Sequence, residues 1–296
     1  MKKNRMLKIA SAMIMLCLIT TCAIGTTFAK YTTADSAADT ARVAKWGVEV
    51  SASGTMFGKA YREVAVLETD DTATVKTSDT AQKVVAPGTS NPTGIQIKLI
   101  GKPEVDFKVT ATHGEIKDIF LNEGTYGTMV KAHGLNVASD MTNIYWFNGA
   151  NYVKEDIFVV EHVDEYYKLM DKVTVAAGKY YPIQWGATVW VNGTKYVQDP
   201  AFPTLDAAVA SLTGADLNKT YKANTDVSFV YELTWAWAFN VSAYADKCDT
   251  ILGNIQAGDE LVVKETGTPG TFAAVTAADY SLEVGCEISV TATQID

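Results

Sequence analysis

The residues with the greatest potential for chemistry in this chain are its three histidines, His113, His133 and His162. They stand 20 and 29 residues apart, and the chain has no His-Glu-x-x-His motif, which would place two zinc ligands on one helix face. A hydrolytic zinc site needs three clustered protein ligands and a carboxylate base. Because the spacing gives no such cluster, we expect no metal site.

Motifs for nucleophilic catalysis and for phosphate binding are also missing from the sequence. There is no Gly-x-Ser-x-Gly elbow, no Gly-rich phosphate loop and no EF-hand pattern. Cys248 is flanked by charged residues, without an adjacent histidine to activate it. The paired carboxylates of a glycosidase are defined by their separation in space, so that pair stays an open alternative. We otherwise expect no catalytic residue and no cofactor.

Residues 1–29 have the three parts of a signal peptide. Basic residues 1–8 precede an apolar run at 9–24, and small residues lead up to Ala29. A bilayer-spanning helix requires about 20 apolar residues, and this run is shorter. We therefore expect cleavage between Ala29 and Lys30, secretion, and no stable membrane insertion of the mature chain.

A lipoprotein is the alternative for this leader, because Cys22 lies at the end of its apolar run. Thr21 precedes that cysteine, where a small residue is expected, so lipidation is the weaker interpretation. Cleavage after Ala29 removes both Cys17 and Cys22 and leaves Cys248 and Cys286. An even pair in an exported protein permits one disulfide, worth about 4 kcal/mol for such a loop. Two buried free thiols are the alternative to that disulfide.

The charge of the chain limits its partners. The full sequence carries 25 basic and 34 acidic residues. The leader contains four of the basic residues and no acidic one, so the mature chain has a net charge of −13. Nucleic acid and anionic lipid repel such a polyanion, and we expect neither as a partner.

Alternation of apolar and polar residues dominates the chain after residue 40 and predicts β-strands. At residues 42–51, one face carries Ala44, Trp46, Val48 and Val50, and the other face is polar. The longest alternation lies in the second half of the chain, at residues 226–242. Because so long an apolar face has to pack against another sheet, we predict an all-β, antiparallel sandwich.

Helix signals are few, and turn signals separate the remaining strands. One helix is expected after Thr204, ending at Gly214, and a shorter helical turn is expected at residues 246–252 before Gly253. The Asn-Gly pair at 192–193 predicts a hairpin. Further strands are predicted at residues 63–68, 93–100, 105–112, 144–147, 152–160, 172–175, 180–191, 260–265, 271–275 and 287–293.

Aromatic residues offer a binding alternative, since exposed rings on a sandwich can stack on sugars. The candidates are Tyr145, Trp146, Trp185, Trp190, Trp235 and Trp237. Alternation assigns Trp235 and Trp237 to the core, whereas Trp146 and Trp185 stay undecided. A surface adhesin that holds glycan or host protein is therefore a second hypothesis.

Three stretches of the chain together resemble a known family. They are the leader exit at 25–32 followed by the strand around Trp46, the Trp-rich stretch 231–239 with the turn at 249–253, and residues 85–89 leading into 103–105. These stretches resemble secreted proteins that depend on the dedicated signal peptidase SipW, among them TasA-like biofilm fibre proteins and camelysin. The resemblance covers most of the chain loosely and is specific in the leader and at 231–253.

The resemblance implies a jelly-roll-like β-sandwich with one or two short helices in connecting loops. It also implies a subunit of a matrix or cell-surface fibre, in which the N-terminal segment of one copy completes the sheet of the next. The partners would be other copies, a SipW-type signal peptidase and accessory matrix proteins. Camelysin has been classed as a metallopeptidase, which makes that activity a third hypothesis.

Under this interpretation the chain divides into three parts. Residues 1–29 are the signal peptide, 30–51 the N-terminal tail and candidate donor strand, and 52–296 the sandwich, with insertions at about 113–170 and 256–280. Trp46, Val48 and Val50 would anchor the donor strand in the neighbouring copy. The alternative is that residues 42–51 pair within their own subunit.

Overall fold

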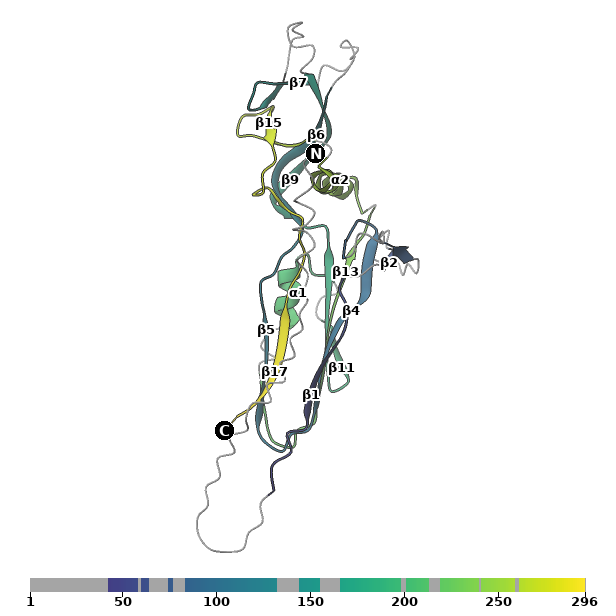
Figure 1. Ribbon diagram of the computed structural model, residues 1–296, viewed down its shortest axis with the longest axis vertical. Helices are drawn as coiled ribbons and strands as arrows, with labels where there is room; N and C mark the ends of the chain where they lie inside the picture. Colours follow the sequence, from purple (N-terminus) through teal and green to yellow (C-terminus); the bar gives the residue numbers. More distant parts are fainter. Residues whose placement is uncertain are drawn as a thin grey trace, which may run out of the picture.

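The computed structural model of the chain describes residues 42–57, 60–63, 74–76, 83–131, 144–154, 166–197, 201–212, 219–239, 241–258 and 261–295. The predicted leader, with its cleavage position between Ala29 and Lys30, lies outside these residues, as do His133 and His162. Figure 1 shows an elongated molecule with a β-sandwich in its lower half and a second group of strands in its upper half. The predicted all-β, antiparallel fold with few helices is confirmed.

The larger sheet of the sandwich is antiparallel and has β4 and β13 at its centre. In order across the sheet, its strands are β11 (Thr194–Val197), β10 (Gln184–Val191), β13 (Val227–Trp237), β4 (Thr89–Gly101), β2 (Ala60–Glu63) and β3 (Thr74–Lys76), with β1 (Val48–Gly54) also paired to β4. Alternate residues of β13 are buried along its whole length, as the sequence pattern predicts. This strand therefore lines the core from one end of the sandwich to the other.

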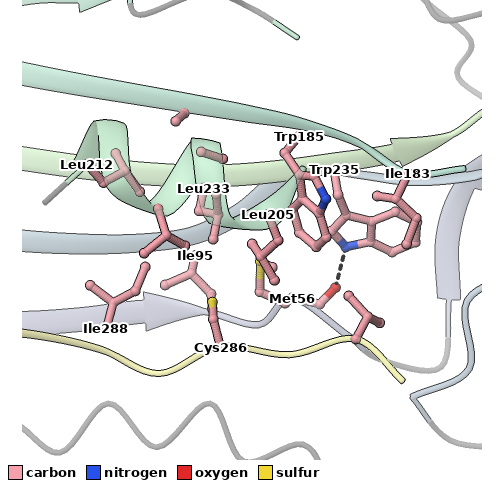
Figure 2. Packing of buried hydrophobic residues seen from close by; sticks show 14 of the residues in the cluster. Met56, Ile95, Ile183, Trp185, Leu205, Leu212, Leu233, Trp235, Cys286 and Ile288 are labelled. Carbon is pink, nitrogen blue, oxygen red and sulfur yellow. Dashed lines mark hydrogen bonds between the residues drawn. The ribbon is translucent and has the colours of Figure 1, made fainter. Parts of the chain in front are cut away.

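The opposing layer is made of a smaller sheet and a helix. The small sheet contains β12 (Thr220–Tyr221), β5 (Phe107–His113) and β17 (Ile288–Gln294), and α1 (Leu205–Leu212) packs on β10 and β13. The predicted N-cap holds, since the Thr204 hydroxyl accepts a 3.2 Å hydrogen bond from the Ala207 amide. Figure 2 shows Leu205 and Leu212 of α1 pointing into the same core as Ile288 of β17.

The upper strands close into a barrel. Six antiparallel strands follow one another around it, and the pairing of β14 with β6 completes the ring. They are β14 (Leu261–Glu265), β15 (Thr271–Ala274), β8 (Tyr152–Lys154), β7 (Ile144–Phe147), β9 (Tyr166–Tyr180) and β6 (Phe120–Lys131), with β16 (Tyr280–Ser281) added on β6. Each ring strand contributes one residue to a separate apolar cluster, which consists of Met129, Tyr145, Tyr152, Leu169, Val263 and Phe272. This cluster fills the barrel interior.

The second helix differs from the sequence prediction. It extends from Ala243 to Ala257 (α2) and packs against β9, β6 and β14, whereas the prediction ended it before Gly253. Gly253 lies inside the helix, and the helix ends at Gly258, whose φ of 68° is the left-handed conformation of a C-cap. Its N-cap is Ser242, whose side chain accepts from the Ala245 amide. No helix among the described residues has the length and apolar character needed to span a membrane.

Candidate functional site

The strand β1 lies at the N-terminal end of the described chain and forms an edge of the larger sheet. It pairs antiparallel with β4, from Val48 opposite Gly101 to Gly54 opposite Ile95. On its other side, β4 pairs with β13 over nearly its full length. Among the described strands, β4 is the only ladder partner of β1. One backbone edge of β1 therefore remains outside any described ladder.

From Trp46 onward the side chains of this segment alternate as the sequence predicts, whereas Ala44 is exposed and the strand begins at Val48 rather than at residue 42. Trp46, Val48 and Val50 are half-buried and pack against the main core, whereas Lys45 and Glu49 are exposed. The Trp46 ring meets the buried Phe107 ring edge-on, with centroids 6.3 Å apart. The three expected anchors thus pack on the core of their own chain. This is the alternative in which residues 42–51 pair within their own subunit.

A carboxylate holds the start of this segment. Glu104 accepts two hydrogen bonds from the Arg42 guanidinium, of 2.6 and 2.8 Å, and one of 2.8 Å from the Lys45 amide. The Glu104 amide donates back to the Lys45 carbonyl at 2.9 Å. The Arg42 hydrogen bonds, followed by that of the Lys45 amide, lower the pKa of Glu104 to about 2. We call this group of contacts the Glu104 clamp.

Glycines mark both ends of the β1–β4 pairing. A Cβ on Gly101 would collide with the carbonyl oxygen of Gly47, and a Cβ on Gly54 would collide with that of Gly94. Gly47 and Gly54 also have positive φ values, of 56° and 85°. Such close backbone approach is possible only for glycine, so sliding β1 along β4 would bring side chains into these crossings.

The chain after β1 is held much more firmly than β1 itself. Met56 and Phe57 are 1% and 3% exposed. The Met56 carbonyl accepts hydrogen bonds from the Trp235 indole, at 2.8 Å, and from the side-chain amide of Asn91, at 3.1 Å. Figure 2 shows the first of these bonds inside the core. We call Met56 and Phe57 the plug.

Cys248 and Cys286 are buried thiols that form no disulfide, which is the second of the two alternatives. Cys248 lies on α2, and Cys286 lies beside Ile288 in the sandwich core (Figure 2). Burial raises the pKa of Cys248 to about 11 and that of Cys286 to about 12. Protonated thiols of this kind are poor nucleophiles.

The aromatic candidates for sugar stacking are mostly internal. Trp185, Trp235 and Trp237 are 0%, 2% and 6% exposed, and Tyr145 lies inside the barrel. Trp185, which the sequence left undecided, is therefore a core residue, and in β10 it pairs with Trp235 of β13. Trp146 and Trp190 are half-buried. The sequence could have predicted the burial of Trp185, because it lies on the same face of its strand as Ala187 and Val189.

The histidine and carboxylate candidates form no metal cluster in the part of the chain that the structure describes. His113 ends β5 and is exposed, with Nδ1 3.0 Å from the Gly114 carbonyl oxygen.

One half-buried carboxylate, Asp118, and one buried carboxylate, Asp249, lie where the barrel meets the sandwich. Asp118, between β5 and β6, accepts a 2.8 Å hydrogen bond from the Leu205 amide of α1. Asp249 of α2 accepts from the Tyr180 hydroxyl at 2.8 Å and from the Trp237 indole at 3.1 Å. Burial, opposed by these hydrogen bonds, raises the pKa of each carboxyl to about 6. No sequence motif marked either residue.

Comparisons with known proteins give no name to this arrangement. No protein-family model, no curated protein and no solved structure matches the chain.

Proposed function

We propose that this protein is a secreted structural subunit of a biofilm matrix or cell-surface fibre, which polymerises by donor-strand complementation. The observation that carries the proposal is β1, an edge strand at the N-terminal end of the sandwich. Its apolar residues Trp46, Val48 and Val50 are only half-buried. An edge strand of this kind can be supplied by another chain with the same backbone pairing.

The resemblance to SipW-dependent, TasA-like proteins supports the same proposal from the sequence. It adds secretion, processing by a SipW-type signal peptidase between Ala29 and Lys30, and accessory matrix proteins as further partners. The proposal names no enzymatic activity and no cofactor, because the sequence contains no motif that calls for either.

Negative-stain electron microscopy of two purified chains tests the proposal. One chain begins at Lys30 and the other at Ala52, which removes the clamp residues and half of β1. We expect fibres from the first chain and none from the second. A peptide of residues 42–51 should raise the melting temperature of the shorter chain, which shows that this chain still folds its acceptor sheet.

Two results would redirect the proposal. Discrete particles from both chains would favour the adhesin, to be tested on a glycan array with Trp146→Ala, the half-buried barrel tryptophan. Stoichiometric zinc and chelator-sensitive cleavage of casein would favour the camelysin-like metallopeptidase. Fibres that form equally well from the chain beginning at Ala52 would rule out the donor strand.

A further inference from the structure

The joint between the barrel and the sandwich contains a carboxylate that contacts both bodies. Asp249 lies at the middle of α2 and is buried. It accepts a 2.8 Å hydrogen bond from the hydroxyl of Tyr180, the last residue of the barrel strand β9. It accepts a second, of 3.1 Å, from the indole of Trp237, the last residue of the sandwich strand β13. One side chain therefore connects α2 to the end of a strand in each body.

The surroundings of Asp249 supply hydrogen-bond donors but no counter-ion. Among the described residues Asp249 forms no ion pair, and the charged group that acts on it most directly is Asp246, one helical turn away. Lys247 of α2 donates instead to the Lys172 carbonyl of β9. Three lysines of the barrel strands packed against α2 contact other groups: Lys172 and Lys179 of β9 lie over the rings of Phe272 and Phe120, and Lys264 of β14 pairs with Asp279. The other titratable groups around this part of the helix are neutral at pH 7, namely Tyr126 of β6, Tyr180 of β9, and Tyr244 and Cys248 of α2.

Burial without a counter-ion makes the charged form of this carboxyl the less stable one. Burial, opposed by the hydrogen bonds from Trp237 and Tyr180, raises the pKa of Asp249 from the ordinary 3.8 to about 6. The stabilisation of the joint by Asp249 is therefore complete at low pH and is lost as the pH rises through about 6. A carboxyl that water reaches returns to its ordinary pKa, so ionisation favours any local opening that hydrates Asp249.

The two halves of α2 differ in what holds them. In the C-terminal half, Ile251 and Leu252 are almost fully buried in the main core. In the N-terminal half, the buried residues are the small Ala245 and Cys248 together with Asp249 itself. Because the N-terminal half has little apolar surface to hold it, this half is the part of the helix that a charge on Asp249 can release.

We infer that Asp249 is a proton-controlled latch between the barrel and the sandwich. With the proton bound, its side chain holds Tyr180 and Trp237, and the whole of α2 stays packed. Without the proton, the N-terminal half of α2 moves away from these two residues, and water reaches the carboxylate. The C-terminal half stays in place, so the release loosens the connection from β13 through α2 to β14 without unfolding either body.

A native cysteine beside Asp249 reports this opening. Cys248 is fully buried while α2 is packed, whereas Cys286 lies in the sandwich core and reports unfolding of the whole chain in the same sample. The chain beginning at Lys30 contains no other cysteine. This chain is exposed, at a series of pH values, to a dithiodipyridine reagent, which labels thiols in acid as well as at neutral pH. Peptide mass spectrometry then gives the labelling rate of each thiol.

The labelling rate of Cys248 should depend on the charge of Asp249. Relative to Asp249→Asn at the same pH, the wild-type rate should rise by roughly fiftyfold between about pH 4 and about pH 7. Dividing by the variant removes the pH dependence of the thiol itself. Asp171→Asn, which changes an exposed carboxylate of β9, is the matched control and should keep the wild-type profile. Tyr180→Phe removes a donor to the ionised form and should extend the rise to higher pH.

Two results would overturn the latch. Labelling of Cys248 and Cys286 that rises in parallel would mean that the whole chain opens at once. A Cys248 profile that is the same in the wild type and in Asp249→Asn would assign the pH dependence to another group. If Asp249→Asn does not fold, the comparison of the two thiols in the wild type, together with Tyr180→Phe, decides the question.

Discussion

The barrel and the sandwich differ in whether the backbone edges of their strands are paired. Each of the six ring strands of the barrel has a ladder partner on both sides. In the sandwich, β1, β3 and β11 each end a described ladder on one side. Closure removes the backbone groups that another chain could pair with, whereas an open edge offers them. Under the proposed function, growth by strand addition is therefore expected at the open edges of the sandwich rather than at the closed ring.

The largest effect on stability is expected from replacing a buried aromatic side chain, first in the barrel and then in the sandwich. Phe272→Ala in the barrel and Phe57→Ala in the plug each remove a buried ring, and each should lower the free energy of unfolding by about 3–5 kcal/mol. Urea unfolding measures this loss. Of the two variants, only Phe57→Ala should also impair fibre growth, because the plug anchors the exchanged strand.

Electron microscopy at a temperature where both variants are folded tests this contrast. If Phe272→Ala abolishes fibres there while Phe57→Ala leaves them intact, the assignment of assembly to the sandwich is wrong.

A smaller effect, of about 2–3 kcal/mol, is expected from pH at the contact between the two bodies. Asp249 has a folded pKa of about 6, above the ordinary value of 3.8 for an aspartate. A raised folded pKa means that the folded state binds the proton more tightly. This contribution to stability is therefore complete at low pH and is lost as the pH rises through about 6.

Asp249→Asn should flatten the fall in unfolding free energy between about pH 4 and about pH 6.5, the interval that separates the ordinary pKa of an aspartate from the folded pKa of Asp249. Asp118, with the same raised pKa, gives the remaining slope and serves as the internal comparison through Asp118→Asn. Urea midpoints across this range measure the slope. Glu104, whose folded pKa is about 2, has a lowered pKa, so its contribution to stability rises with pH and is complete above its ordinary pKa of 4.5, opposite in sign to that of Asp249. An unchanged slope in Asp249→Asn would contradict the assignment.

The smallest effect on stability, with a larger one on assembly, is expected at the Glu104 clamp. The Arg42 side chain is 74% exposed, so Glu104→Gln should leave the urea midpoint unchanged within error. Fibre elongation, followed by light scattering, should slow several-fold and lose its sensitivity to salt. Glu49→Gln, an exposed carboxylate on the same segment, is the matched control. Equal slowing in both variants would mean that general charge, rather than the clamp, governs elongation.

Local patterns were sufficient to predict individual elements. The alternation in β13, the N-cap Thr204 and the inward faces of Trp46, Val48 and Val50 all follow from neighbouring residues. The hairpin at Asn192 also does, because Asn-Gly adopts the positive φ values that a tight turn needs.

What could not be predicted depends on residues far apart in the chain. Barrel closure requires β14 to meet β6, and the clamp joins positions 42 and 104. No periodicity in the sequence encodes such pairings. The length of α2 was missed for a local reason, since Gly253 is tolerated within a helix that packs against three barrel strands.

The connections between the two bodies have a mechanical consequence. Among the described elements the chain crosses between sandwich and barrel four times, from β5 to β6, from β9 to β10, from β13 through α2 to β14, and from β16 to β17. A pulling force along the long axis of the molecule (Figure 1) is divided among these crossings, because they act in parallel. The joint therefore behaves as a stiff coupling rather than a tether, and extension of the molecule under load should begin at the singly attached β1.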